Sequence, residues 1–326
     1  MSQSERGLED SENREVSVIA CGGNALIDPS LPPTVANQFA VATRAMLPIA
    51  ELITQGEQLL LTHGNGPQVG FMQLRSELAS DEIHQVPLDS LVANTQGAIG
   101  YMIQRALREA LNSRQQRVEV ASIVTEVIVD RNDRAFEEPT KPIGRFYSSE
   151  ESVALSERRG WDMVEDSHRG WRRVVSSPTP VRVVQFDTIR RLVNAGVVVV
   201  ACGGGGIPIQ VMADGRIEGV EAVIDKDRVS ALLAVQLQAK RLVITTEVDC
   251  VYRDFRQPTQ QCLVRTNIEE LRELAGEGQF PAGSMRPKVE AAIFFLRRGG
   301  QEVIICHPEH LCEAFAGKAG TRIYAE

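Results

Sequence analysis

The chain is poor in lysine. Of its 35 basic side chains only five are lysine, and the other thirty are arginine. Three lysines stand inside unusual segments, at Lys141, Lys226 and Lys288. Arginine replaces lysine easily on a surface, but its planar guanidinium cannot replace a compact ammonium placed between small anions. These three lysines therefore predict a phosphate or carboxylate site. For Lys240 and Lys318, placement by chance stays open.

Features of several other protein classes are missing. Aromatic residues make up 5% of the chain and the formal net charge is −8, so neither base-stacking platforms nor a basic stripe for nucleic acid is expected. No apolar run reaches the roughly 18 residues of a membrane span. Residues 1–15 form a polar tail without the apolar core of a signal peptide. We therefore expect a cytoplasmic protein without nucleic-acid or membrane partners.

The cysteines and histidines have no metal-ligand spacing. There is no C-x-x-C pair, and several cysteines lie in apolar, strand-like runs. We therefore expect reduced, buried thiols and no protein-bound metal. The six cysteines are Cys21, Cys202, Cys250, Cys262, Cys306 and Cys312.

The common nucleotide and hydrolase motifs are also missing. The chain has no G-x-x-x-x-G-K-[ST] loop, no G-x-G-x-x-G fingerprint, no G-x-S-x-G elbow and no protein-kinase catalytic loop. A P-loop enzyme is excluded, and a Rossmann dehydrogenase is weakly supported.

The pattern along the chain is typical of an α/β protein. Short apolar runs alternate with amphipathic segments, as in a mostly parallel sheet covered by helices, and 326 residues fit one large domain with an inserted subdomain. Strands are predicted at 16–21, 58–62, 118–129, 197–202, 241–245 and 302–306. Helices are predicted at 34–54, from 67 onward, and at 88–111, 185–194, 226–238, 268–275 and 284–298.

The composition changes between about residues 130 and 180. Prolines, charged residues and both tryptophans gather there without a long apolar run. This indicates an inserted, protruding arm or lid rather than sheet.

Three glycine-rich turns each follow a predicted strand. They are 22–24 (Gly-Gly-Asn), 63–66 (His-Gly-Asn-Gly) and 203–206 (four glycines). In an open α/β sheet such turns gather at the carboxyl ends of the strands, where backbone N–H groups and helix N-termini bind anions. Three turns together with three rare lysines favour an anion site over plain loop geometry. His63 is a possible base, but a structural hydrogen-bonding role is favoured.

Eight segments resemble the motifs of carbamate kinase, in the expected order from about residue 16 to residue 321. They are Ala20–Ala25 (ACGGNA), Thr62–Gly70 (THGNGPQVG), Thr95–Tyr101 (TQGAIGY), Pro139–Gly144 (PTKPIG), Gly170–Val175 (GWRRVV), Cys202–Pro208 (CGGGGIP), Glu221–Asp227 (EAVIDKD) and Gly283–Ala292 (GSMRPKVEAA).

The resemblance implies the amino-acid-kinase fold, a three-layer α/β/α sandwich in one domain over 16–326 with the subdomain at about 130–180. It also implies a homodimer that transfers a phosphoryl group between ATP, with Mg²⁺, and carbamate, giving ADP and carbamoyl phosphate. The N-terminal half would hold the small acid, and residues from about 200 to 326 the nucleotide.

The resemblance also implies roles for individual residues. Lys141, Lys226 and Lys288 would be catalytic, with Asp227 orienting Lys226. The small acid would contact Lys141 and the two N-terminal turns, through Gly22, Gly23, Asn24, Gly64, Asn65 and Gly66. The nucleotide would contact Gly203, Gly204, Gly205, Lys226, Thr245, Asp249, Met285 and Lys288.

The chemistry agrees with these roles. Carbamate oxygen is already ionised, so the reaction needs charge neutralisation and in-line placement rather than a general base. Asp225 and Asp227 would keep Lys226 charged and fixed, although a solvated turn explains Asp225 about as well. Two alternatives remain: a kinase of another small acid, and a catalytically silent paralogue that binds nucleotide and regulates a partner.

The chain departs from the family pattern in four places. Cys21 replaces a leucine, which is a packing change. The other three lie on the nucleotide side: Glu247, the pair Arg256 and Gln257, and the order of residues in 280–283. Nucleotide preference is therefore the property most affected.

Overall fold

The structure is a computed structural model, and it describes residues 15–22, 28, 30–32, 34–166, 170–280 and 283–326. A sheet of eight strands crosses the molecule in the order β15-β17-β16-β12-β1-β2-β9-β3. Neighbouring strands are parallel, except that β16 and β17 are antiparallel. The strands are β1 (Val16–Cys21), β2 (Gln58–His63), β3 (Val120–Ser122), β9 (Val198–Val200), β12 (Arg241–Thr245), β15 (Arg265–Asn267), β16 (Glu302–Cys306) and β17 (Thr321–Tyr324).

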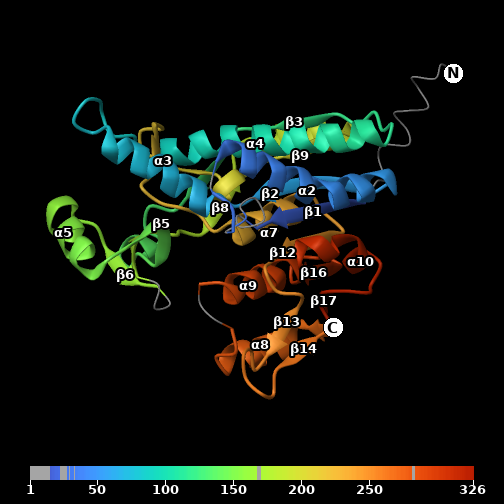
Figure 1. The fold of residues 1–326 in the computed structure, drawn as a ribbon. Helices are drawn as coiled ribbons and strands as arrows, with labels where there is room; N and C mark the ends of the chain where they lie inside the picture. The colour runs from blue at the N-terminus through green and yellow to red at the C-terminus, as the bar shows by residue number, and fades with distance from the viewer. Residues whose placement is uncertain (1–14, 23–27, 29, 33, 167–169, 281–282) are drawn as a thin grey trace.

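Helices cover both faces of this sheet (Figure 1). Ile19 and Cys21 of β1 pack in a core with α2 (Val35–Thr54), α4 (Leu88–Ser113) and α10 (Leu311–Phe315). Val18 and Ala20 pack on the opposite side with α6 (Phe186–Asn194), α7 (Lys226–Gln236), α8 (Ile268–Gly276) and α9 (Met285–Leu296). Burial on both faces explains why these strands are continuous apolar runs. The predicted three-layer architecture with a mostly parallel sheet is confirmed.

No helix within the described ranges combines the length and apolar character needed to cross a membrane.

The predicted strand 118–129 is two strands in different sheets. β3 joins the main sheet beside β9, whereas β4 (Glu126–Val129) joins a sheet of four strands in the order β11-β10-β4-β8. The other members are β8 (Pro180–Val183), β10 (Ile207–Val211) and β11 (Ile217–Gly219). β10 and β11 are not predicted from the sequence, because β10 contains a proline and β11 has only three residues, so neither has a clear period-2 pattern.

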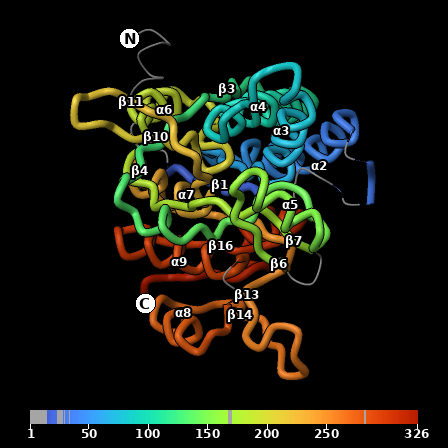
Figure 2. The backbone as a smooth tube through the Cα atoms, turned by 90° about the vertical axis from the view of Figure 1, so that its left-hand side faces the viewer, coloured from blue at the N-terminus to red at the C-terminus, as the bar shows by residue number. Residues whose placement is uncertain are grey.

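The inserted segment contains a sheet, so the expectation that it is not sheet is wrong. β5 (Lys141–Tyr147), β6 (Met163–Glu165) and β7 (Trp171–Val175) form an antiparallel sheet in the order β5-β7-β6. We call residues 141–175, with α5 (Ser149–Arg159) between β5 and β6, the arm; it projects from one side of the molecule, green in Figures 1 and 2. Proline, glycine and a register shift in β5 hide its period-2 pattern.

The helix of the arm begins and ends at strong local signals. Ser148 and Glu151 form a reciprocal capping box at the start of α5. Gly160 ends it in the left-handed conformation with φ 65°. These caps stabilise a helix that has one buried residue, Ser152.

The arm lies directly against α3 (Gly66–Leu78). A Cβ atom on Gly70 would be 2.6 Å from the Cα of Gly144, so the two backbones meet without an intervening side chain. Gly144 has φ +73°, which a side chain would strain. The ion pair between Arg159 and Glu77, with an N–O distance of 3.4 Å, ties α5 to the other end of α3.

Two of the six cysteines are paired, so the expectation of six reduced thiols is wrong. β13 (Val251–Arg253) and β14 (Gln261–Leu263) form an antiparallel hairpin that places Cys262 opposite Tyr252. Cys250 precedes β13, and its Cα lies 6.0 Å from that of Cys262, to which a disulfide joins it. The hairpin that brings them together consists of strands too short to be predicted. Cys21, Cys202 and Cys306 are buried free thiols, and Cys312 is partly buried.

We expect Gly70→Ala to lower the free energy of unfolding by about 1–3 kcal/mol, because its methyl group would press on the backbone of the arm. Gly97→Ala in α4 is the matched control: its Cβ would meet nothing within 4 Å, and alanine is the better helix former by about 1 kcal/mol. Urea denaturation of both variants measures the difference. Equal stability of Gly70→Ala and the wild type would contradict the tight contact.

Candidate functional site

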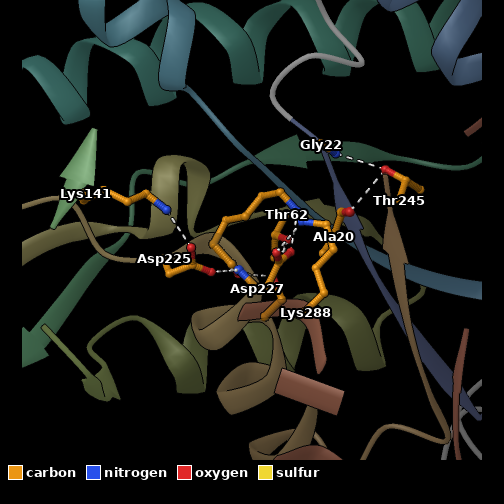
Figure 3. Close-up of polar contacts among 10 residues, drawn as sticks. Ala20, Gly22, Thr62, Lys141, Asp225, Asp227, Thr245 and Lys288 are labelled. Atoms are coloured by element: carbon orange, nitrogen blue, oxygen red, sulfur yellow. Dashed lines mark hydrogen bonds and ion pairs between the residues drawn. The ribbon is translucent and has the colours of Figure 1, made fainter. Parts of the chain in front are cut away.

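Three lysines from distant segments converge on two carboxylates at the N-terminus of α7. Figure 3 labels two of these lysines, Lys141 and Lys288, and both aspartates. The Nζ atom of Lys226 lies 2.5 Å from Oδ1 of Asp227, and that of Lys288 on α9 lies 2.9 Å from Oδ2 of the same residue. Lys141, from the arm, lies 2.6 Å from Oδ2 of Asp225. The three lysines singled out in the sequence thus share one site.

Local sequence explains how α7 presents these groups. Asp225 is the N-cap of the helix, and its Oδ1 accepts a hydrogen bond of 2.9 Å from the backbone N–H of Asp227. Asp225 is 8% exposed, so its interpretation as a solvated turn residue is wrong. Because the helix starts here, Lys226 and Asp227 lie in its first turn.

The charges in this cluster depend on one another. Burial alone would raise the pKa of Asp227, but Lys226 and Lys288 outweigh burial and lower it. Burial lowers the pKa of Lys226, against the attraction of Asp227 and with the repulsion of Lys288. For Lys288 burial acts in the same direction, but Asp227 prevails and raises its pKa.

The cluster carries an excess of positive charge. Three ammonium groups face two carboxylates, which leaves a net charge of +1 when all five groups are ionised. In a buried setting such an excess attracts an anion strongly, because little water screens it.

Two hydroxyl groups, those of Thr62 and Ser230, connect β2 to the helix that carries the cluster. The Ser230 hydroxyl donates to the carbonyl of Lys226 at 2.6 Å. The Thr62 hydroxyl, 2.6 Å from that of Ser230, is therefore the donor in their contact. These bonds tie β2 to the first turn of α7; neither residue was predicted to support the site, because a single threonine or serine carries no distinctive signal.

The turn after β2 brings Asn65 to the start of α3. Its Nδ2 donates to the hydroxyl of Thr95 at 2.9 Å, and that hydroxyl donates to the carbonyl of Val92 at 2.7 Å. Asn65 is the N-cap of α3, but its side chain does not cap the helix. The N-terminus of α3, where Gly66 lies, therefore keeps backbone N–H groups that Asn65 does not occupy, the usual arrangement for anion binding.

The four-glycine turn packs against the same groups. A Cβ on Gly203 would be 2.3 Å from Nε2 of His63, and one on Gly204 would be 2.2 Å from Nδ2 of Asn65. The amide of Gln96 holds this turn, donating to the carbonyls of Gly203 at 3.0 Å and Thr125 at 3.1 Å. Gly203–Gly205, a short 3₁₀ turn, thus lies beside residues assigned to the small acid, and its nucleotide role stays a prediction.

Gln96 and Thr95 were not assigned roles from the sequence. Both stand in a segment that resembles the family, TQGAIGY, and both are buried. A buried amide in the middle of a helix is the signal that would have pointed to them, since such a group needs hydrogen-bond partners.

The remaining predicted residues of the nucleotide side lie at or after the end of β12 and at the start of α9. The hydroxyl of Thr245 accepts from the N–H of Gly22 at 3.0 Å and donates to the carbonyl of Ala20 at 3.3 Å. Asp249 is exposed, 3.9 Å from a nitrogen of His310, and Met285 begins α9, partly buried. Some positions singled out in the sequence lie outside the described residues: Gly23, Asn24, residues 1–14 of the predicted tail at 1–15, Pro281 and Ala282.

Within the part of the chain that the structure describes, no three histidine, cysteine, aspartate or glutamate side chains gather in a way that would hold a metal ion.

The comparisons with known proteins agree with this geometry. A model of the amino acid kinase family matches residues 15–307. The chain belongs to the amino acid kinase family. It is 45% identical to the carbamate kinase of Pyrococcus furiosus over 94% of this chain and 98% of that protein.

Two further relatives are informative. A carbamate kinase-like protein of Escherichia coli, YahI, is 43% identical over 95% of this chain and 99% of its own. The structure of carbamate kinase from Giardia lamblia bound to AMP-PNP superposes with a TM-score of 0.88, with 36% identity, over 96% of this chain and 99% of that one.

His63 predicts a pH dependence of stability. Burial lowers its pKa to about 4, and its Nδ1 donates to the carbonyl of Gly64. In the unfolded chain His63 takes up a proton near pH 6.5, and in the folded chain only near pH 4. The free energy of unfolding therefore decreases as the pH drops below 6.5. Between pH 7.5 and 5.0 we expect His63 to account for a loss of about 2 kcal/mol.

Urea denaturation at the two pH values checks this expectation. His63→Gln should lack that loss, and His84→Gln, in an exposed loop, should retain it. The same loss in all three proteins would contradict a buried, neutral His63.

Proposed function

We propose that the protein is a carbamate kinase, which transfers a phosphoryl group reversibly between ATP and carbamate to give ADP and carbamoyl phosphate. The observation that carries this proposal is the convergence of Lys141, Lys226 and Lys288 on two aspartates at one helix N-terminus. The names of the relatives, carbamate kinases from several organisms, support it.

In this proposal the lysines neutralise the negative charge on the phosphoryl group that is transferred. Lys226 and Lys288 contact its equatorial oxygens, and Asp227 holds both ammonium groups at fixed positions. Lys141 contacts the carbamoyl phosphate from the arm. No general base takes part, because the attacking carbamate oxygen is already an anion.

The small acid is held by the two turns at the carboxyl ends of β1 and β2. We assign it to Gly22, Gly23, Asn24, Gly64, Asn65 and Gly66, with backbone N–H groups as donors. Thr95 accepts from Nδ2 of Asn65 and so fixes the orientation of that amide.

The nucleotide is assigned to the C-terminal half, from about residue 200. The residues that would line its site, together with Lys226 and Lys288, are Gly203, Gly204, Gly205, Thr245, Asp249 and Met285. The related Giardia structure bound to AMP-PNP supports a nucleotide of the ATP type. Mg²⁺ would accompany it and be held mainly by phosphate oxygens, since lysines already contact both oxygens of Asp227. A cytoplasmic homodimer completes the proposal.

One observation favours a second candidate. The Escherichia coli relative at 43% identity is named only carbamate kinase-like. A kinase of another small acid, or a silent nucleotide-binding paralogue, therefore remains the alternative. The departures at Glu247, Arg256 and Gln257 lie on the nucleotide side, where such a divergence would show.

We expect the purified protein to convert ADP and carbamoyl phosphate to ATP in the presence of Mg²⁺, which a coupled assay measures. Rapid formation of ATP supports the proposal. ATP-dependent phosphorylation of acetylglutamate without turnover of carbamoyl phosphate would instead identify a kinase of another acid. Nucleotide binding without any turnover would favour the silent paralogue.

A further test of the proposal compares two lysines of the cluster with the two lysines that lie outside it. We expect Lys226→Arg and Lys288→Arg to lower kcat more than about tenfold, because the planar guanidinium cannot take the place of the ammonium between Asp227 and a phosphoryl group. Lys240→Arg and Lys318→Arg keep their charge outside the cluster and should retain wild-type kcat. Wild-type rates in all four variants would refute the role of the compact ammonium.

A further inference from the structure

One ion pair joins the arm to the lysine cluster. Lys141 is the first residue of β5, Asp225 precedes α7, and they are 84 residues apart in the sequence. Their side chains meet at 2.6 Å (Figure 3), where the lysine side chain is 32% exposed and that of the aspartate 11%. The contact therefore links a projecting segment to a buried one.

The two oxygens of Asp225 serve different partners. Oδ1 accepts from the backbone N–H of Asp227 and so caps α7, whereas Oδ2 accepts from Lys141. Asparagine caps helices about as well as aspartate does. The negative charge is thus not needed for the cap, and it can be removed separately.

The charge has a clear task in holding Lys141. Lys226 and Lys288 already share Asp227, and both repel a third ammonium group that approaches them. Asp225 supplies the opposite charge for that third group. Burial would raise the pKa of Asp225, but Lys141 leads the lysines that lower it, so the carboxylate stays ionised.

The arm also carries a built-in reporter of its position. Trp161 and Trp171, the two tryptophans of the chain, both lie on it. The guanidinium groups of Arg159 and Arg173 lie 5.2 and 4.8 Å from the ring centroid of Trp161. The same two arginines pair with Glu77 and Glu221 of the main body, at 3.4 and 3.7 Å. Movement of the arm away from the body would break these pairs and free both guanidinium groups to leave the ring, which would expose Trp161 to more water.

We infer that Asp225 is a positioning residue: it docks the arm on the main body before substrate binds, by holding Lys141 where an anionic substrate then contacts it. The substrate then binds the ammonium group of Lys141, which is already in position. Without the charge of Asp225 the docked arrangement is less populated, and a substrate must bring the arm back, which weakens its apparent affinity by the docked fraction. This last step rests on the proposed function; the docking itself does not.

Tryptophan fluorescence of the full-length protein without substrate tests the docking. We expect Asp225→Asn and Lys141→Met each to shift the emission to the red and to increase quenching by acrylamide. The double variant should change no more than either single one, because both remove the same contact. Asp187→Asn, which removes an exposed ion pair on α6, is the control and should leave the fluorescence unchanged.

The alternative outcomes are distinct. Wild-type emission and quenching in both single variants would overturn the inference. Thermal unfolding shows whether each variant is folded. If Asp225→Asn does not fold, Lys141→Met decides alone, since its side chain is partly exposed and caps no helix.

Kinetics then test the consequence for catalysis. For Asp225→Asn we expect the KM for carbamoyl phosphate to rise about tenfold with kcat within about threefold of wild type, the pattern of lost binding rather than lost transition-state stabilisation. Asp225→Ala also loses the cap and should reduce both parameters. A lower KM in Asp225→Asn would mean that Asp225 merely competes with the substrate, which overturns the inference. If carbamoyl phosphate is not a substrate, the proposed function fails, but the fluorescence still decides the docking.

Discussion

The site depends on one buried carboxylate, that of Asp227, which two ammonium groups share. Each charge alone would be costly to bury, and the aspartate is stable there because Lys226 and Lys288 contact its two oxygens. The arrangement requires α7 and α9 to lie side by side with their first turns at the same edge of the sheet. The core beneath both helices, formed by β1, β12 and β16, sets that geometry.

Close backbone packing has the same role around the cluster. The four-glycine turn fits against His63 and Asn65 only without side chains, and Gly70 meets Gly144 in the same way. Glycine here is thus required as much by neighbouring protein atoms as by any ligand. The hydrogen bonds of Thr95 and Gln96 then fix these turns with respect to α4.

The sequence predicts best the parts that are buried on both sides. The strands 241–245 and 302–306 have the predicted bounds, because their apolar runs begin and end abruptly. The hairpin of Cys250 and Cys262 is not predicted, since its strands of three residues carry no periodic signal. The sheet of the arm is not predicted either, because proline, glycine and a register shift hide the pattern of β5. The scarcity of lysine predicted that Lys141, Lys226 and Lys288 belong to one site. The capping role of Asp225 and the hydrogen bonds of the Gln96 amide are seen only in the structure.

The register of the arm has a topological consequence. Lys141 and Val175, its first and last residues, are paired across β5 and β7, so the chain leaves the main body and returns to it at adjacent points. A segment inserted in this way can change in length or sequence at its far end without altering the path of the main chain. The base of the arm is different, because Lys141 lies there, and the boundary between insertion and host is also where the third lysine enters the site.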